Sequence, residues 1–191
     1  MAERRSVLRR LLRPRILLPA AVFFAVVMSA GLYAFQPWKL VLDQTVDEAA
    51  PTGAPVAAGA PAEPSAAPLE AAEPTVLAQG ELISHEHETT GSVRILGLPD
   101  GSRVLRLENF RTSNGPQLKV WLSDAAVVAG RAGWFTFDDG RYVDLGALKG
   151  NIGSQNYDVP AEVDLGALSS LSIWCDRFNV SFGAAELQPA I

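Results

Sequence analysis

The hydrophobic positions of this 191-residue chain follow two different patterns. Near the N-terminus, residues 16–35 form an apolar stretch without a single charged side chain. A helix of that length is about 30 Å long, which matches the hydrocarbon core of a bilayer. From Gly80 onward, apolar side chains instead alternate with polar ones in short runs. The first pattern predicts a transmembrane helix, and the second predicts β-strands.

The alternation in the C-terminal part predicts an all-β domain. Apolar and polar residues alternate at 93–95, 105–107 and 118–122, and Pro99–Gly101 has the composition of a turn between the first two runs. No sustained helical periodicity is found downstream of the apolar stretch. We therefore expect residues 80–191 to form a small antiparallel β-sandwich or barrel-like domain.

The middle of this domain is less regular. Asp138–Gly140 has the composition of a turn, and it separates the apolar runs Trp134–Phe137 and Tyr142–Leu145. This arrangement predicts a hairpin. The preceding stretch, Ala125–Ala132, is typical of either a short helical turn or an insertion.

The last apolar segment changes its parity. Its apolar residues are odd-numbered within 171–175 and even-numbered within 178–182. A single strand buries both sets on one face only if an extra residue is inserted between them. We therefore predict a β-bulge or kink at Asp176–Arg177.

Charges around the apolar stretch predict its orientation. Residues 1–15 form an arginine-rich tail with six arginines and one acidic residue, which the positive-inside rule places in the cytoplasm. Trp38 suits the opposite interface. A cleaved secretory signal is the alternative, but its apolar region would be shorter, about 7–15 residues, and would end at a small-x-small site. We expect an uncleaved signal-anchor, so that the bilayer is a partner through residues 16–35 and the C-terminal domain is extracytoplasmic.

Residues 36–79 are expected to connect the helix to the domain. They comprise a juxtamembrane segment followed by an alanine- and proline-rich stretch without aromatic residues. Such a stretch buries too little apolar surface to offset the entropy lost on ordering, so we predict a disordered linker.

The charge of the domain excludes one class of partner. From Gly80 to the C-terminus there are 9 basic and 14 acidic residues, five more negative than positive. Nucleic-acid binding requires clustered basic groups, so we expect no nucleic-acid partner. The abundance of arginine, alanine, glycine and proline over the whole chain is typical of GC-rich bacterial genomes, which points to a bacterial cell envelope.

Cys175 is the only cysteine, so the domain contains no internal disulfide. Its parity with Ile173 predicts that it points into the core. A lone buried cysteine commonly acts as a small apolar residue. The functional alternatives are a redox thiol or a ligand to a metal ion or a haem.

His85 and His87 are the only histidines. In an extended strand, residues two apart point the same way, so both imidazoles would face one ion or partner. A complete metal site needs three or four ligands, which makes this pair a weak metal motif. A solvated or hydrogen-bonded strand end is the alternative.

No complete catalytic constellation is present in the sequence. There is no Gly-x-Ser-x-Gly motif, no phosphate-binding glycine loop and no Cys-x-x-Cys motif. The carboxylates of Asp138, Asp139, Asp144 and Asp158 are scattered through predicted turns, so hydrolysis of a wall component has little support. The sequence therefore favours a protein that is not an enzyme.

Three blocks of the domain resemble the DM-thirteen domain family. They are Leu105–Ser123, Leu145–Tyr157 and Leu171–Phe178, in the family's order. The resemblance covers roughly residues 80–188. It implies a β-rich extracytoplasmic module that takes part in electron transfer at cell surfaces, with a cysteine that acts as a bare thiol or holds a prosthetic group such as haem.

Cys175 matches that cysteine, and His87 matches a histidine that recurs shortly before a Thr-x-Gly sequence in the family. The resemblance thus implies Cys175 as the redox thiol and the pair Cys175 and His87 as cofactor ligands. No haem or oxidoreductase domain accompanies the module in this sequence, so an envelope redox protein is the expected partner. The competing hypothesis is a non-catalytic cell-envelope binding or adhesion module.

Overall fold

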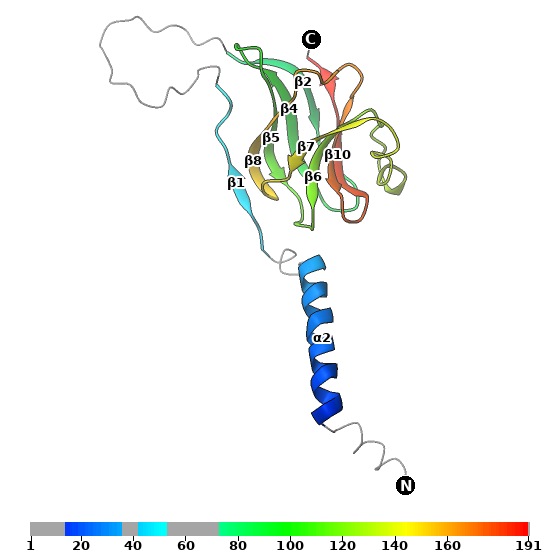
Figure 1. Ribbon diagram of the computed structural model, residues 1–191. Coiled ribbons are helices and arrows are strands. Elements are labelled where there is room, and N and C mark those ends of the chain that lie inside the picture. Colours follow the sequence, from blue (N-terminus) through cyan, green and yellow to red (C-terminus); the bar gives the residue numbers. More distant parts are fainter. Residues whose placement is uncertain (1–13, 36–41, 53–72, 191) are drawn as a thin grey trace, which may run out of the picture. The chain divides into compact units, whose positions relative to one another are not determined.

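The computed structural model describes residues 14–35, 42–52 and 73–190 (Figure 1). Compact units cover residues 1–39 and 40–191, and each is described by itself. Most of the predicted arginine-rich tail, the predicted interface residue Trp38 and residues 53–72 of the predicted linker lie outside the described residues.

The first unit contains one helix, α2, from Pro14 to Phe35. It coincides with the helix predicted over residues 16–35, and Pro19 lies inside it, beyond the first turn. Among the described residues, however, no helix is both long and apolar enough to qualify as a membrane span. The prediction that this helix is transmembrane is therefore not confirmed.

The second unit is a sandwich of two sheets, which confirms the predicted β-sandwich. One sheet has the order β1-β8-β5-β4-β2-β11 and the other β3-β10-β9-β6-β7. All strand pairs are antiparallel except β1 with β8. The strands are β1 (Thr45–Asp47), β2 (Thr75–Glu81), β3 (Ile83–Ser84), β4 (Thr90–Gly97), β5 (Arg103–Arg111), β6 (Leu118–Ser123), β7 (Tyr142–Ala147), β8 (Ile152–Asp158), β9 (Ser170–Cys175), β10 (Val180–Glu186) and β11 (Gln188–Pro189).

The central strands of the second sheet, β6, β9 and β10, are buried on both faces. Leu171, Ile173 and Cys175 of β9 face the main core between the sheets. Trp174 of β9 belongs to a smaller core on the other face, with Trp121, Phe137 and Ala184. Every residue of β9 is buried as a result, although an antiparallel sheet commonly leaves one face to solvent.

The segment between β6 and β7 covers this outer face. It contains a short 3₁₀ helix, Arg131–Gly133, within the stretch for which a helical turn or an insertion was expected. The predicted hairpin from Trp134 to Leu145 is wrong, because Trp134–Phe137 forms no strand. Phe137 is instead fully buried, with its ring against Trp174 at 6.4 Å between centroids. Its apolar run therefore reflects packing onto a sheet face and not strand formation.

The predicted bulge at Asp176–Arg177 is also wrong. Residues 170–186 form two strands, β9 and β10, joined by a turn at 176–179, and Cys175 pairs with Val180. The turn reverses the chain, so Val180 and Phe182 reach the same core as the odd-numbered residues of β9 without an inserted residue. Phe178 lies in the turn itself and is exposed. The register irregularity of this pair lies further on, between Ser181 and Gly183.

Strand β1 adds a parallel edge to the first sheet, within the segment that was predicted to be linker. Val46 pairs with Gly153, whose φ is +107°. A Cβ at position 153 would lie 1.9 Å from the carbonyl oxygen of Val46, so only glycine permits this approach. A long connection, residues 48–74, then separates β1 from β2 along the chain.

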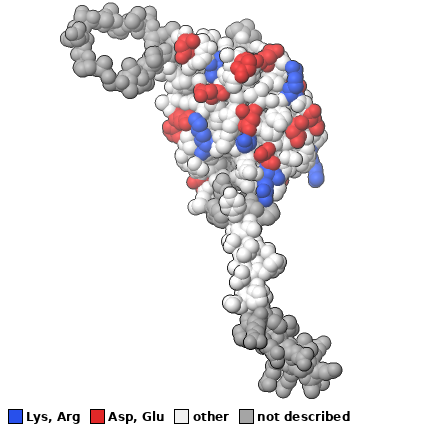
Figure 2. All heavy atoms as spheres, in the orientation of Figure 1, with Lys and Arg blue, Asp and Glu red and all other residues white. Residues whose placement is uncertain are grey.

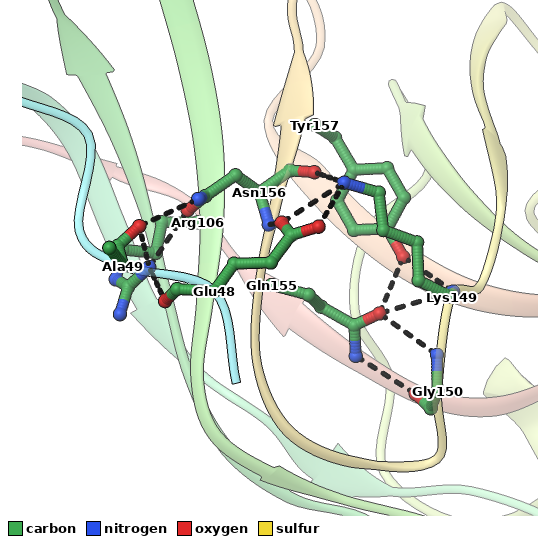
Figure 3. Close-up of polar contacts among 8 residues, drawn as sticks. All are labelled: Glu48, Ala49, Arg106, Lys149, Gly150, Gln155, Asn156 and Tyr157. Carbon is green, nitrogen blue, oxygen red and sulfur yellow. Dashed lines mark hydrogen bonds and ion pairs between the residues drawn. The ribbon is translucent and has the colours of Figure 1, made fainter. Parts of the chain in front are cut away.

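Charged groups fasten the end of β1, as Figure 3 shows. The carboxylate of Glu48 accepts hydrogen bonds from Lys149 Nζ, at 2.8 and 3.0 Å, and from the backbone N–H of Asn156, at 2.7 Å. Arg106 Nη1 donates to the carbonyl oxygens of Glu48 and Ala49, at 3.1 and 3.2 Å. Both side-chain and backbone groups of this segment are therefore anchored to the domain.

A buried amide holds the turn to which Lys149 belongs. Gln155 is fully buried, and its Oε1 accepts bonds from the backbone N–H groups of Lys149 and Gly150 and from the hydroxyl of Tyr157. Its Nε2 donates to the carbonyl oxygen of Gly150, at 2.9 Å. This fully bonded side chain fixes the β7–β8 connection and so places Lys149 beside β1 (Figure 3).

Replacing Lys149 should loosen β1 specifically. Lys149→Met keeps the length of the side chain but removes its ion pair with Glu48. Because the pair is partly exposed, we expect local opening of β1 to become easier by about 0.5–1 kcal/mol. Amide hydrogen exchange at Glu48, whose N–H is bonded to the carbonyl of Ser154, measures this opening.

The matched control is Lys119→Met, which removes the pair with Asp144 on the second sheet. That change should leave exchange at Glu48 unaltered. Equal exchange in the wild type and in Lys149→Met would show that the ion pair does not hold β1.

Acid should weaken the same contact. The hydrogen bond from Lys149 is the largest effect on the pKa of Glu48, which lies below its ordinary value. A carboxyl with a lowered pKa contributes stability above its ordinary pKa and loses it as the pH falls through the folded-state value. In an NMR titration, the amide signals of Val46 and Asp47 should shift before the domain unfolds, and less so in Lys149→Met. Signals that stay constant until global unfolding would contradict this.

Candidate functional site

Cys175 lies at the end of β9, enclosed in the main core. It is a free cysteine with 0% exposure. In the sheet it is opposite Leu118 on one side and Val180 on the other. Its thiol donates a hydrogen bond to the carbonyl oxygen of Pro116, at 3.2 Å. The inward orientation predicted from the sequence is thus present.

The loop that carries Pro116 covers the thiol. It joins β5 to β6, and the backbone N–H of Asp176 donates to the carbonyl oxygen of Gln117, at 3.1 Å. A Cβ at Gly115 would lie 2.8 Å from the ring of Phe182, which is tighter than carbon atoms tolerate. Glycine therefore lets the loop lie against this ring and present the Pro116 carbonyl to Cys175.

The surroundings keep the thiol protonated. Burial is the largest effect and raises the pKa of Cys175, and the carboxylates of Glu86 and Asp176 raise it further. The backbone N–H groups of Phe178 and Arg177 act in the opposite direction. Because the thiolate is the nucleophile and metal ligand, a protonated and buried thiol is chemically quiet.

His87 lies at the same end of the sandwich as Cys175. Its ring is 3.8 Å from that of Phe182, and its Nδ1 is 2.6 Å from the hydroxyl oxygen of Ser113, in the covering loop. Phe182 belongs to the core cluster that contains Cys175. The loop contacts both residues implied by the family resemblance, through Ser113 at His87 and through Pro116 at Cys175.

His85 has different neighbours. Its Nδ1 is 2.9 Å from the hydroxyl oxygen of Ser181, and its ring is 5.8 Å from that of Phe137 in the outer-face core. Burial lowers the pKa of His85, opposed by the backbone of Val128, so the imidazole is neutral at pH 7. The chain leaves β3 after Ser84, so these histidines do not lie on one extended strand.

A serine–histidine cluster lies beneath the outer-face segment. The hydroxyl oxygen of Ser181 is 3.0 Å from that of Ser172, in addition to its contact with His85. Both serines have 0% exposure. A nucleophilic serine must be reached by its substrate, so this buried cluster serves the packing of β9 and β10 and is not a hydrolytic site.

The sequence did not reveal a stack of aromatic rings on the outer face of the second sheet. Tyr142 stacks on Trp121 at 4.1 Å and 11°, and Trp121 stacks on Trp174 at 5.0 Å and 21°. Phe137 continues the series edge-on. The sequence did contain one signal for this stack, the alternation of side-chain direction along a strand. Trp121 and Trp174 alternate with the residues that fill the main core, which places both on the opposite face.

A haem or a metal ion at Cys175 does not fit the closed site. Cavities of about 730, 490 and 230 Å³ lie on the domain, and Cys175 lines none of the three. No group of three or more His, Cys, Asp or Glu side chains is arranged around one metal position in the described part of the chain. An iron centre would reach Cys175 only after displacement of the covering loop.

Residues 81–187 match a protein family model whose description is Electron transfer DM13. The matched segment takes up more than half of the chain and includes Cys175, His85 and His87. Neither a curated protein nor a solved structure matched the chain.

The thiol should be protected by the loop that contains Gly115. In the folded full-length chain, we expect Cys175 to react slowly with a thiol reagent. Gly115→Ala should overpack the loop against Phe182 and favour its opening by about 1–3 kcal/mol. If opening limits the reaction, labelling accelerates by about 5- to 150-fold.

Two variants control this measurement. Gly166→Ala, whose added Cβ would meet only the Asp164 carboxylate, at 3.3 Å, should leave the labelling rate unchanged. Asp139→Cys places a second thiol at an exposed position, which should react at once. Rapid labelling of Cys175 in the folded wild type would disprove its enclosure.

Proposed function

Because this chain belongs to the Electron transfer DM13 family, we propose that it is an electron-transfer accessory protein in which Cys175 donates the electron. One observation carries this proposal. The only cysteine of the chain, at the position implied by the family resemblance, is held as a buried and protonated thiol without a disulfide partner. A thiol of this kind is protected from reagents in solution but retains an electron to donate.

The chemistry of such a thiol is a one-electron step. Cys175 loses one electron to an acceptor and its proton to a base, for which we propose the exposed carboxylate of Asp176, the next residue. The product is a thiyl radical and a reduced acceptor. The acceptor is a one-electron oxidant on a partner protein, such as a haem or a copper centre.

We also propose that the domain lies outside the cytoplasm and is tethered to the cell membrane through residues 16–35. The support is the sequence alone, in which an uncharged twenty-residue stretch follows six arginines. Protease digestion of intact and permeabilised cells tests this placement. Protection of the domain in intact cells, or its release by alkaline extraction, would contradict it.

A binding or adhesion module is the second candidate. A cavity of about 730 Å³ favours it, because its lining includes the Arg94–Glu108 ion pair and the acidic residues Glu81 and Glu186. In that case Cys175 would be an ordinary core residue. Lysines and arginines alternate with acids over the face shown in Figure 2, which offers no patch of one charge.

One substitution separates the two candidates. Cys175→Ser keeps a donor for the Pro116 carbonyl and should cost only about 1–2 kcal/mol of stability. The full chain is treated with a one-electron oxidant, and mass spectrometry after spin trapping then locates the radical. We expect the adduct at Cys175 in the wild type and at aromatic residues in Cys175→Ser.

Circular dichroism and thermal unfolding serve as the control that Cys175→Ser is folded. If Cys175 of the folded wild type stays a free thiol while other residues are oxidised, the electron-transfer role of Cys175 is wrong. A binding module would then be favoured.

A further inference from the structure

We infer that Tyr142, Trp121 and Trp174 form the path by which an electron leaves the interior beside Cys175 and reaches the surface. This inference rests on the proposed function. Because Cys175 has 0% exposure, no partner touches its sulfur in the closed domain. Electron transfer from it must therefore pass through the protein.

The three rings lead from solvent to the strand that bears the thiol. Tyr142 has an exposed fraction of 45%, whereas Trp121 and Trp174 are 4% and 1% exposed. Trp174 is covalently joined to Cys175 on β9, on the opposite face of the strand. The backbone between these two residues is the only step that crosses the sheet.

Ring overlap favours transfer along this series. Tyr142 and Trp121 are nearly parallel, with centroids 4.1 Å apart, and Trp121 and Trp174 are 5.0 Å apart. Phenol and indole are the aromatic side chains that lose an electron most readily. The phenyl ring of Phe137, which follows Trp174 edge-on, does not share this property, so the oxidisable series ends at Trp174.

The hydrogen-bonding environment of the rings favours passage of an electron over accumulation of a radical. Nε1 of Trp121 is buried without a hydrogen-bond partner among the described residues, so the oxidised indole keeps its proton. An indole cation in an apolar site is energetically costly, so an electron from a neighbouring group quickly reduces it. The exposed phenol of Tyr142, in contrast, exchanges its proton with water.

The electrons and protons balance over the whole path. The partner's one-electron oxidant takes an electron from Tyr142, which releases its phenolic proton to water. Trp121 then gives an electron to the oxidised Tyr142, which recovers a proton from water. Trp174 in turn gives an electron to the oxidised Trp121. Cys175 finally gives an electron to Trp174 and its proton to Asp176, which passes the proton to water, so that only the thiol is changed.

The outer end of the path is accessible. Tyr142 lines a cavity of about 490 Å³ together with Val143, Val163 and Leu168. Arg141, which also lines it, is turned to the Asp124 carboxylate, 3.3 Å away. An acceptor group placed in this cavity would therefore meet Tyr142 and apolar side chains, beside the acidic residues Glu162 and Asp164.

A photo-oxidant attached near Tyr142 tests the path in the full-length chain. Asp139→Cys provides an exposed thiol three residues from Tyr142 for a ruthenium polypyridyl label, while the buried Cys175 stays unlabelled. A light flash excites the label, and an added quencher then takes an electron from it. The oxidised label in turn withdraws an electron from the protein. We expect transient absorption to show a tyrosyl radical followed by a tryptophanyl radical.

Substitutions by phenylalanine keep the stacking but remove the oxidisable ring. In Trp121→Phe the tryptophanyl signal should fall to background while the tyrosyl signal persists, and in Tyr142→Phe both should be lost. Trp134→Phe, outside the stack, is the matched control and should change neither. Thermal unfolding checks that each variant is folded. In Trp174→Phe the tryptophanyl signal should persist, because Trp121 remains, and Tyr142→Phe provides the second test if Trp121→Phe does not fold.

Two outcomes separate this inference from the function on which it rests. An undiminished tryptophanyl signal in folded Trp121→Phe or in Tyr142→Phe, or no tryptophanyl signal in the labelled parent, would overturn the path. In the labelled parent, Cys175→Ser should prolong the tryptophanyl radical, because its internal donor is removed. An unchanged lifetime there, with the effects of the phenylalanine variants intact, would leave the path standing and contradict the role of Cys175.

Discussion

The burial of β9 on both faces is the constraint on which the rest of the domain depends. Its inner face places Cys175 in the main core, and its outer face places Trp174 under the β6–β7 segment. Adjacent residues of a strand point in opposite directions, so a thiol and an indole become neighbours along the chain while facing different cores. The electron-transfer proposal follows from this geometry, because the sheltered thiol has an oxidisable ring one residue away.

The cover over the thiol is connected to the edge of the first sheet. Asn114, next to Gly115 in the covering loop, donates its side-chain N–H to the carbonyl oxygen of Leu42, at 2.9 Å. Leu42 precedes β1, which Glu48 and Lys149 hold on β8. Contacts that fasten β1 therefore also support the loop above Cys175. Through this link, a change in the segment that follows α2 along the chain can alter the accessibility of the thiol.

The sequence was sufficient for the sandwich, for the turn after β4 and for the inward position of Cys175, since each depends on local alternation or turn composition. It was insufficient where distant segments decide the structure. Trp134–Phe137 has the apolar pattern of a strand, but packing on the second sheet holds it as a loop. The parity change after Cys175 reflects a chain reversal, which alternation alone does not distinguish from a bulge. Strand β1 was missed because three residues carry no periodic signal and their partner, β8, lies about a hundred residues away.

The central claim is that Cys175 loses its electron while it remains enclosed. The most direct test compares two rates in the same sample of full-length chain, oxidation of Cys175 by a bulky one-electron oxidant and alkylation of Cys175 by a small thiol reagent. Alkylation requires the loop to open, whereas electron transfer through the rings does not. We predict that oxidation is much faster than alkylation and does not change in Gly115→Ala. Oxidation that is no faster than alkylation, and that accelerates with it in Gly115→Ala, would show that the thiol reacts only when exposed.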